Sequence, residues 1–380
     1  MGDTRYAVHH LGGRWGDGPF PRLTAFSSDF VHVLYEADVD GLPGPTQIEA
    51  NTTVVATCLA GERGPRTLNL TFNPGGTSLL EPADNVRGLY RPTLGIDFDL
   101  DRGLDVIGRR QLDADTLDAV IAAGNLPAPD FLSLDTQGTE FEILAAAPRA
   151  LAKACGLIVE VEFIEMYRGQ KRFQEVLDLL DGAGFAFIRF TRMGELSGPR
   201  RPLGLRGRGR QIWADALFLR RPDGDGPISA TRLLKLAFTA LVFGHIEFAL
   251  AWLDQVMPDD PAFAASDRGY AALLREVKRE ATGGPMPPIL SRILPRDKIQ
   301  LFSTTPAAAW AELFELASFQ DPSYLAQLDA LACVDTTPFE RVLRSYGLEE
   351  VAAEVTDTRR AQAREVRDTL TRSQTGARSA

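Results

Sequence analysis

Hydrophobic residues in the first part of the chain form short β-rich runs, and segments with helical periodicity lie between them. This alternation is typical of a sheet built from parallel βαβ units. The expected strands are Tyr6–Leu11, Val31–Tyr35, Thr53–Leu59, Phe131–Leu134, Leu157–Phe163, Phe185–Phe190 and Ile212–Leu219. The expected helices are Leu112–Ala123, Phe141–Lys153 and Arg172–Gly184. The pattern predicts an α/β fold whose last two strands form an antiparallel hairpin.

The pattern changes after Arg221–Pro227, a cluster of residues that break helices and strands. Beyond it the periodicity predicts helices alone. They are Ser229–Val256, Phe263–Ala281, Thr305–Phe319, Tyr324–Ala332, Pro338–Tyr346 and Glu349–Thr371. We therefore expect two domains: an α/β domain over residues 1–222, and an all-α accessory domain over residues 223–380 with a frayed polar tail.

Composition and charge narrow the class of partner. The chain has 380 residues, 44% hydrophobic and 24% charged, as in ordinary globular proteins with packed cores. Its net charge of −10 argues against a nucleic-acid partner, because affinity for phosphate backbones comes from Lys and Arg. A small-molecule or glycan substrate fits better, and a homo-oligomer is compatible with these numbers.

Cysteine usage and apolar stretches bear on location. The three cysteines lie far apart without a Cys-x-x-Cys pair, which indicates a reducing compartment. The first residues lack the basic and apolar regions of a signal peptide, so we expect a cytoplasmic protein. The stretch Leu233–Leu253 approaches the length of a membrane span but contains Lys235, His245 and Glu247, so we expect a buried helix and no stable membrane insertion.

The segment Phe131–Asp135 is a short apolar strand that ends in a carboxylate. Ligands of open α/β sheets bind at the carboxyl ends of strands, so Asp135 is expected where chemistry occurs. Gly138 permits a tight turn before a helix that begins near Glu140. Acids in a first helical turn also suit the helix dipole, so helix capping is the alternative role for Glu140.

This segment resembles the FkbM-type methyltransferases, whose hallmark is an apolar strand, Asp, two residues, Gly, a small residue, Glu and an apolar helix. The chain has Asp135, Gly138, Thr139 and Glu140 in that arrangement, and the resemblance continues to about residue 220. It implies a Rossmann-like class I methyltransferase sheet that uses S-adenosylmethionine. Through the same resemblance, Ser78, Gln137, Glu140 and Tyr167 are expected on the substrate side.

Two further acids, Glu160 and Glu162, alternate with valines and so share one face of their strand, near Asp135. Together with Asp135 they could deprotonate an acceptor hydroxyl as catalytic residues. A divalent cation held by these acids could also promote deprotonation of the acceptor hydroxyl, although nothing in the sequence demands a metal. The alternative is salt bridging to the basic residues Arg168, Lys171 and Arg172.

The cofactor residues are expected after the first strands. Gly12, Gly13 and Gly16 would let the backbone approach the ligand, and the resemblance places Glu36 on the two ribose hydroxyls with Ala37 beside it. Leu59 and Ala60 would border the adenine, and Asp135 is expected among the cofactor-binding residues as well. The chain has His10 where methyltransferases usually carry an acid before the first glycine, and Asp17–Pro21 breaks the expected helix.

The sequence thus favours an S-adenosylmethionine-dependent methyltransferase that acts on a hydroxyl of a glycan or secondary metabolite. The irregular segment His10–Gly16 leaves open a degenerate, non-catalytic relative that works through its helical domain. A dinucleotide-dependent oxidoreductase is disfavoured because the glycines lack the Gly-x-Gly-x-x-Gly spacing. Five arginines between the last two strands would either attract an anionic acceptor or form a solvated loop; they are Arg200, Arg201, Arg206, Arg208 and Arg210.

Overall fold

The computed structural model describes residues 5–12, 28–37, 51–86, 89–92, 97–99, 103–196, 209–222, 228–256 and 274. The chain divides into two compact units, Met1–Lys278 and Arg279–Ala380, and every described residue belongs to the first. Apart from Leu274, which is helical, the helices expected beyond residue 256 lie outside the described residues.

Within the described residues, seven strands form one sheet in the order β11-β12-β10-β9-β1-β2-β3. They are β1 (Tyr6–Gly12), β2 (Phe30–Glu36), β3 (Thr52–Ala56), β9 (Phe131–Asp135), β10 (Gly156–Glu162), β11 (Phe185–Leu196) and β12 (Arg210–Arg220). The pairs β3–β2, β2–β1, β1–β9 and β9–β10 are parallel, whereas β12 runs antiparallel to both of its neighbours. The expected α/β fold with a final antiparallel hairpin is confirmed.

The strand order reverses between β1 and β9. The chain steps outward from β1 to β3 and then returns to the other side of β1. Connections leave neighbouring strands in opposite directions at such a point, which opens a crevice at the carboxyl ends of the strands. Gly12 and Asp135 end β1 and β9 in register, so both lie at this crevice.

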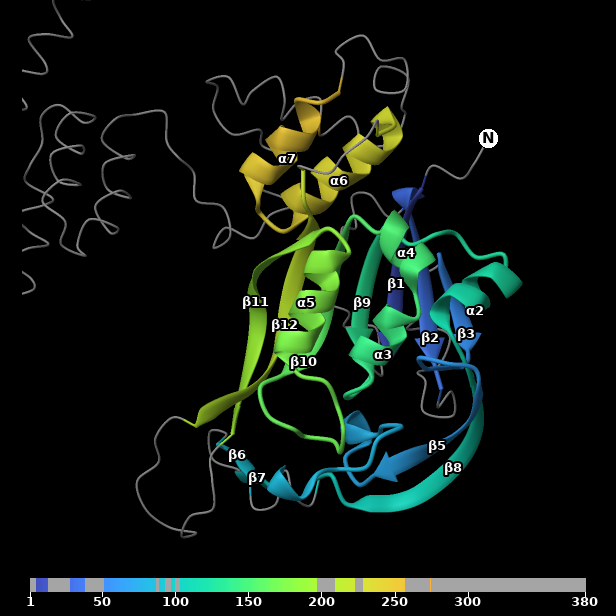
Figure 1. Ribbon diagram of the computed structural model, residues 1–380, viewed down its shortest axis with the longest axis vertical. Helices are drawn as coiled ribbons and strands as arrows, with labels where there is room; N and C mark the ends of the chain where they lie inside the picture. Colours follow the sequence, from blue (N-terminus) through green and yellow to red (C-terminus); the bar gives the residue numbers. More distant parts are fainter. Residues whose placement is uncertain are drawn as a thin grey trace, which may run out of the picture. The chain divides into compact units, whose positions relative to one another are not determined.

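Four helices cover one face of the sheet in Figure 1: α2 (Leu117–Ala123), α3 (Glu140–Ala145), α4 (Pro148–Lys153) and α5 (Phe173–Gly182). Their apolar residues join a buried core with Leu132, Val159 and Val161 of the sheet. The helix expected over Phe141–Lys153 is divided, because Pro148 lacks the N–H that would continue the hydrogen-bond ladder and begins α4 instead.

A second, three-stranded sheet follows β3, with the order β4-β8-β5. Its strands are β4 (Cys58–Leu59), β5 (Gly64–Thr71) and β8 (Val106–Asp115); short 3-10 turns at Pro74–Gly76 and Asp84–Val86 and the pair β6 (Tyr90–Pro92) and β7 (Asp97–Asp99) lie in the same insertion. Figure 1 shows β5 and β8 across the end of the large sheet at which β2 and β3 finish.

This insertion corrects two sequence expectations. The strand expected over Thr53–Leu59 is divided at Thr57 between the two sheets. The helix expected from Leu112 begins only at Leu117, because β8 pairs along its length with β5 and Thr116 then caps α2 by accepting a hydrogen bond from the Ala119 N–H.

The helix expected over Ser229–Val256 is two helices, α6 (Ala230–Val242) and α7 (Ile246–Leu253), separated at Gly244 with φ +82°. Although the sequence placed them after a domain boundary at residue 222, they belong to the first compact unit. The Tyr6 hydroxyl lies 2.5 Å from Thr239 Oγ1, which joins α6 to the start of β1. In the part of the chain that the structure describes, no helix has the length and apolarity to cross a membrane.

Candidate active site

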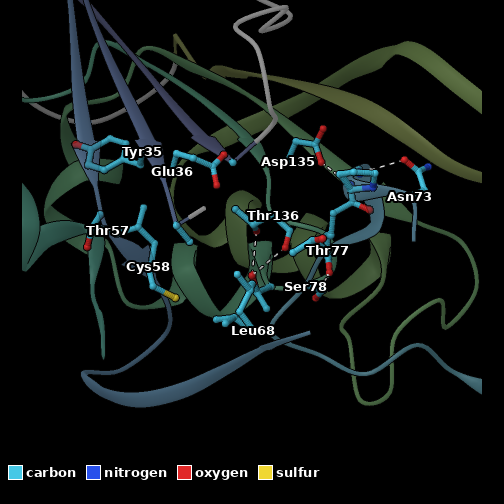
Figure 2. A pocket seen from close by; sticks show the side chains of 18 residues that line it. Tyr35, Glu36, Thr57, Cys58, Leu68, Asn73, Thr77, Ser78, Asp135 and Thr136 are labelled. Atoms are coloured by element: carbon cyan, nitrogen blue, oxygen red, sulfur yellow. Dashed lines mark hydrogen bonds between the residues drawn. The ribbon is translucent and has the colours of Figure 1, made fainter. Parts of the chain in front are cut away.

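A cavity of about 490 Å³ lies at the carboxyl ends of β1, β2 and β9. Gly12, Glu36 and Asp135 line it from the large sheet, as Figure 2 shows for Glu36 and Asp135. The insertion supplies another part of its wall through Asn73–Gly75 and Thr77–Leu79. The cavity thus lies at the point where the strand order reverses.

Glycine is required at position 12 for two reasons: the backbone conformation and the lack of space for a side chain. Its φ of +71° lies in the left-handed region, and a Cβ built on it would stand 2.1 Å from the Asp135 carbonyl oxygen. Two residues earlier, His10 Nδ1 lies 2.9 Å from Ser133 Oγ, so this residue forms a polar contact between β1 and β9. Gly13 and Gly16, also expected at the cofactor, lie outside the described residues.

Glu36 ends β2, and its side chain is largely buried. It lines the cavity together with the neighbouring Ala37 and with Leu59 from β4, as expected. Ala60 does not border the described cavity and instead packs in a small cluster with Cys58 and Ala114.

The turn between β9 and α3 is held by Glu140. Its Oε1 accepts hydrogen bonds from the Thr136 N–H (2.6 Å) and the Thr136 hydroxyl (2.9 Å), and its Oε2 accepts one from the Gly138 N–H (2.9 Å). Gln137 and Gly138 adopt φ of +59° and +100°. Glu140 is buried under the turn, does not line the described cavity, and makes the hydrogen bonds of the capping role. Its contact with substrate stays a prediction.

The Gln137 side chain is the centre of a hydrogen-bond network. Its Nε2 donates to Asp135 Oδ1 (2.5 Å) and to Glu160 Oε2 (2.6 Å). Its Oε1 accepts from the Tyr167 hydroxyl (2.8 Å), and its carbonyl accepts from the Ser78 hydroxyl (2.7 Å). Asp135, Gln137 and Ser78 line the cavity, whereas Glu160 and Tyr167 lie behind them.

Buried carboxyl groups form a cluster beneath Asp135. Burial raises the pKa of Glu160 and of Glu162 well above its ordinary value, and the neighbouring acids Asp135 and Glu140 add to both shifts. Asp215, opposite Glu160 in the register of β10 and β12, has a pKa raised to about 6 by burial and by the charge of Asp135. Among the described residues, no group of His, Cys, Asp and Glu side chains is arranged to hold a metal ion.

The basic residues expected as alternative partners of Glu160 and Glu162 make other contacts. Arg168 pairs with Asp84 at 3.3 Å, and the Lys171 ammonium lies 5.9 Å from the centre of the Phe141 ring. The two acids therefore face the Asp135 cluster, as the alternation along the strand predicted, but neither borders the cavity directly.

Comparison with known proteins found a similarity in this part of the chain. Residues 50–187 match the family model described as the methyltransferase FkbM domain. The matched residues include Asp135, Gln137 and the three buried acids on α3 and β10, while Gly12 and Glu36 precede them.

A solved structure shares some of this similarity. It is the crystal structure of methyltransferase FkbM from Methylobacillus flagellatus KT, with 13% sequence identity and a TM-score of 0.28. The alignment covers 57% of this chain and 44% of that chain, so this chain spans less than half the length of the protein it matches. No curated protein matches the sequence.

Three threonines that line the cavity were missed in the sequence. They are Thr57, between β3 and β4, and Thr136 and Thr139 of the β9–α3 turn. Thr136 and Thr139 are adjacent to motif residues and could have been found there. Thr57 carried no signal, because only the fold brings it to the crevice.

The buried Glu140 predicts a pH-dependent stability. Burial raises its pKa from 4.5 to about 7, so between these values the folded state binds more protons than the unfolded state. Stability should therefore fall as pH rises through about 7. Glu140 should contribute at most about 3 kcal/mol to this decrease in the free energy of unfolding. The contribution should be absent from Glu140→Gln when urea unfolding is compared at about pH 5 and about pH 8.

The exposed Glu62, which pairs with Arg66, provides the control. Glu62→Gln should retain the wild-type difference between the two pH values. The same fall in Glu140→Gln as in wild type would contradict a role of Glu140 in this pH dependence.

Proposed function

We propose that this protein transfers a methyl group from S-adenosylmethionine to a hydroxyl oxygen of a glycan or secondary-metabolite acceptor. The observation that carries the proposal is the convergence of Gly12, Glu36 and Asp135 on one cavity at the reversal of strand order. Strand order, with β12 reversed between β10 and β11, fits a class I methyltransferase sheet.

The cavity residues fit the cofactor. A volume of about 490 Å³ is in the range of small-molecule sites. Gly12, with no side chain, lets the end of β1 lie close against the Asp135 backbone at the cavity. The Glu36 carboxylate can accept hydrogen bonds from both ribose hydroxyls. Leu59 and Leu79 offer apolar surface to an adenine ring. Bound S-adenosylmethionine supplies an electrophilic methyl group.

The protein's own contribution is to position and deprotonate the acceptor. Asp135 lines the cavity and can accept the proton of an acceptor hydroxyl, while Glu160 acts on it from behind through Gln137. Thr77 and Asn73 provide hydroxyl and amide groups on another part of the wall.

Substitution of Glu36 tests the cofactor site. Glu36→Gln should weaken binding of S-adenosylmethionine by about tenfold or more, because a carboxylate that accepts two hydroxyls is replaced by a group with one acceptor oxygen. Isothermal titration of the full chain measures the effect. Glu62→Gln, the same change at an exposed position outside the cavity, should bind as wild type does.

Absence of binding by the wild-type chain would overturn the proposed function. It would favour instead the degenerate relative that works through its helical domain, whose helices beyond residue 256 lie outside the described residues. Equal affinity of wild type and Glu36→Gln would remove Glu36 from the cofactor site.

A further inference from the structure

The carboxylates of Asp135 and Glu160 lie on neighbouring strands and face the same amide nitrogen. Gln137 Nε2 is 2.5 Å from Asp135 Oδ1 and 2.6 Å from Glu160 Oε2. Two carboxyl groups held this close to one point repel each other unless a proton, a cation or a hydrogen-bond donor lies between them. Here the amide group occupies that position.

The orientation of the amide follows from its partners. Its nitrogen faces carboxyl oxygens of Asp135 and Glu160, which accept hydrogen bonds. Its oxygen faces the Tyr167 hydroxyl, whose hydrogen can go to this oxygen (2.8 Å) or to the Gly76 carbonyl oxygen (3.1 Å). A flipped amide would place oxygen against two carboxylate oxygens. Both N–H bonds of Gln137 are therefore committed to protein acids, which leaves the amide no N–H for the substrate contact that the sequence suggested.

The backbone presets this arrangement. Gln137 adopts φ +59°, and its carbonyl accepts a hydrogen bond from Ser78. Glu140 fixes the residues on either side through the Thr136 and Gly138 N–H groups. A non-glycine residue in the left-handed region that is held on three sides is characteristic of a functional position.

We propose that Gln137 is a positioning residue that takes the place of a divalent cation between Asp135 and Glu160. The proposal rests on the proposed function: Gln137 holds Asp135 toward the acceptor hydroxyl, so that acceptor activation needs no metal. In the transfer the acceptor O–H bond breaks and its proton passes to Asp135. The new O–CH3 bond forms as the S–CH3 bond breaks, with its electron pair left on sulfur.

Manganese binding to the full chain tests the proposal without any acceptor. Gln137→Glu replaces the donor with a third carboxylate, and Gln137→Ala removes the donor from between the acids. Both variants should bind Mn2+ at least about tenfold more tightly than wild type, as monitored by electron paramagnetic resonance, because affinity rises with the charge and access of the oxygen ligands. Gln111→Glu is the control, since Gln111 is exposed and bonds to Thr67 away from the cluster.

The Gln111→Glu variant should bind Mn2+ as wild type does. Wild-type affinity for Mn2+ equal to that of both Gln137 variants would overturn the proposal. Thermal unfolding establishes that each variant is folded, and Gln137→Ala retains the test if the added charge prevents folding. Titration with S-adenosylhomocysteine separates the two proposals: loss of the manganese difference with intact binding refutes the role of Gln137 alone, whereas failure of wild type to bind refutes the proposed function.

Discussion

Gly12→Ala should abolish measurable binding of S-adenosylhomocysteine and destabilise the domain. The new Cβ would stand 2.1 Å from the Asp135 carbonyl oxygen, so the pairing of β1 with β9 has to shift at the cavity. The left-handed φ of +71° adds about 1–2 kcal/mol for a residue with a side chain. We expect affinity to fall more than about a hundredfold by isothermal titration, with a lower midpoint of thermal unfolding.

Gly169→Ala is the matched control for backbone conformation. Gly169 has φ +77°, and a Cβ built on it meets nothing within 4 Å. This variant should show the conformational cost alone and retain wild-type binding. Wild-type affinity of Gly12→Ala would exclude the close approach of β1 to β9 as a condition for the cofactor site.

Lys235→Met should destabilise the protein by about 3–5 kcal/mol near neutral pH, because it leaves a buried carboxylate without its counter-charge. Lys235 Nζ lies 2.6 Å from Asp130 Oδ2 and 2.8 Å from the Arg5 carbonyl oxygen, and the side chains of the ion pair are only 13% and 11% exposed. Asp130 also accepts a hydrogen bond from the Ala7 N–H at 2.8 Å. The ion pair therefore attaches α6 to the amino ends of β1 and β9.

The titration of Asp130 determines how the stability loss in Lys235→Met depends on pH. Burial raises the pKa of this carboxyl, and the charge of Lys235 lowers it. Without Lys235, protonation of Asp130 should relieve the penalty, so the deficit in urea unfolding should shrink as pH falls. The double variant Lys235→Met with Asp130→Asn should recover much of the loss.

Arg168→Met provides the comparison, since its pair with Asp84 is exposed on both sides and should contribute at most about 1 kcal/mol. If Lys235→Met also lowered the free energy of unfolding by only about 1 kcal/mol, α6 would fold independently of the sheet, as a domain boundary at residue 222 requires.

Local sequence patterns predicted the elements whose structure depends mainly on their own residues. Short apolar runs predicted β1, β2, β9 and β10 within one or two residues, because these strands are buried in a parallel sheet. The order of small and acidic residues after Phe131 placed Asp135 at the end of its strand. The pattern failed for β8, where Leu112–Asp115 belongs to a strand through its pairing with β5, a segment more than forty positions earlier.

The sequence by itself determined the α/β class, the position of Asp135 and Glu36 at the ends of their strands, and the resemblance to FkbM methyltransferases, since these follow from residue types at short spacing. Only the tertiary structure decided that Asp135 faces the cavity while Glu160 lies behind it, and that Gln137 bonds to both. It also decided that α6 packs on the sheet. The reason is the same in each case: hydrogen bonds and ion pairs between distant segments depend on strand order and register, which no local pattern contains.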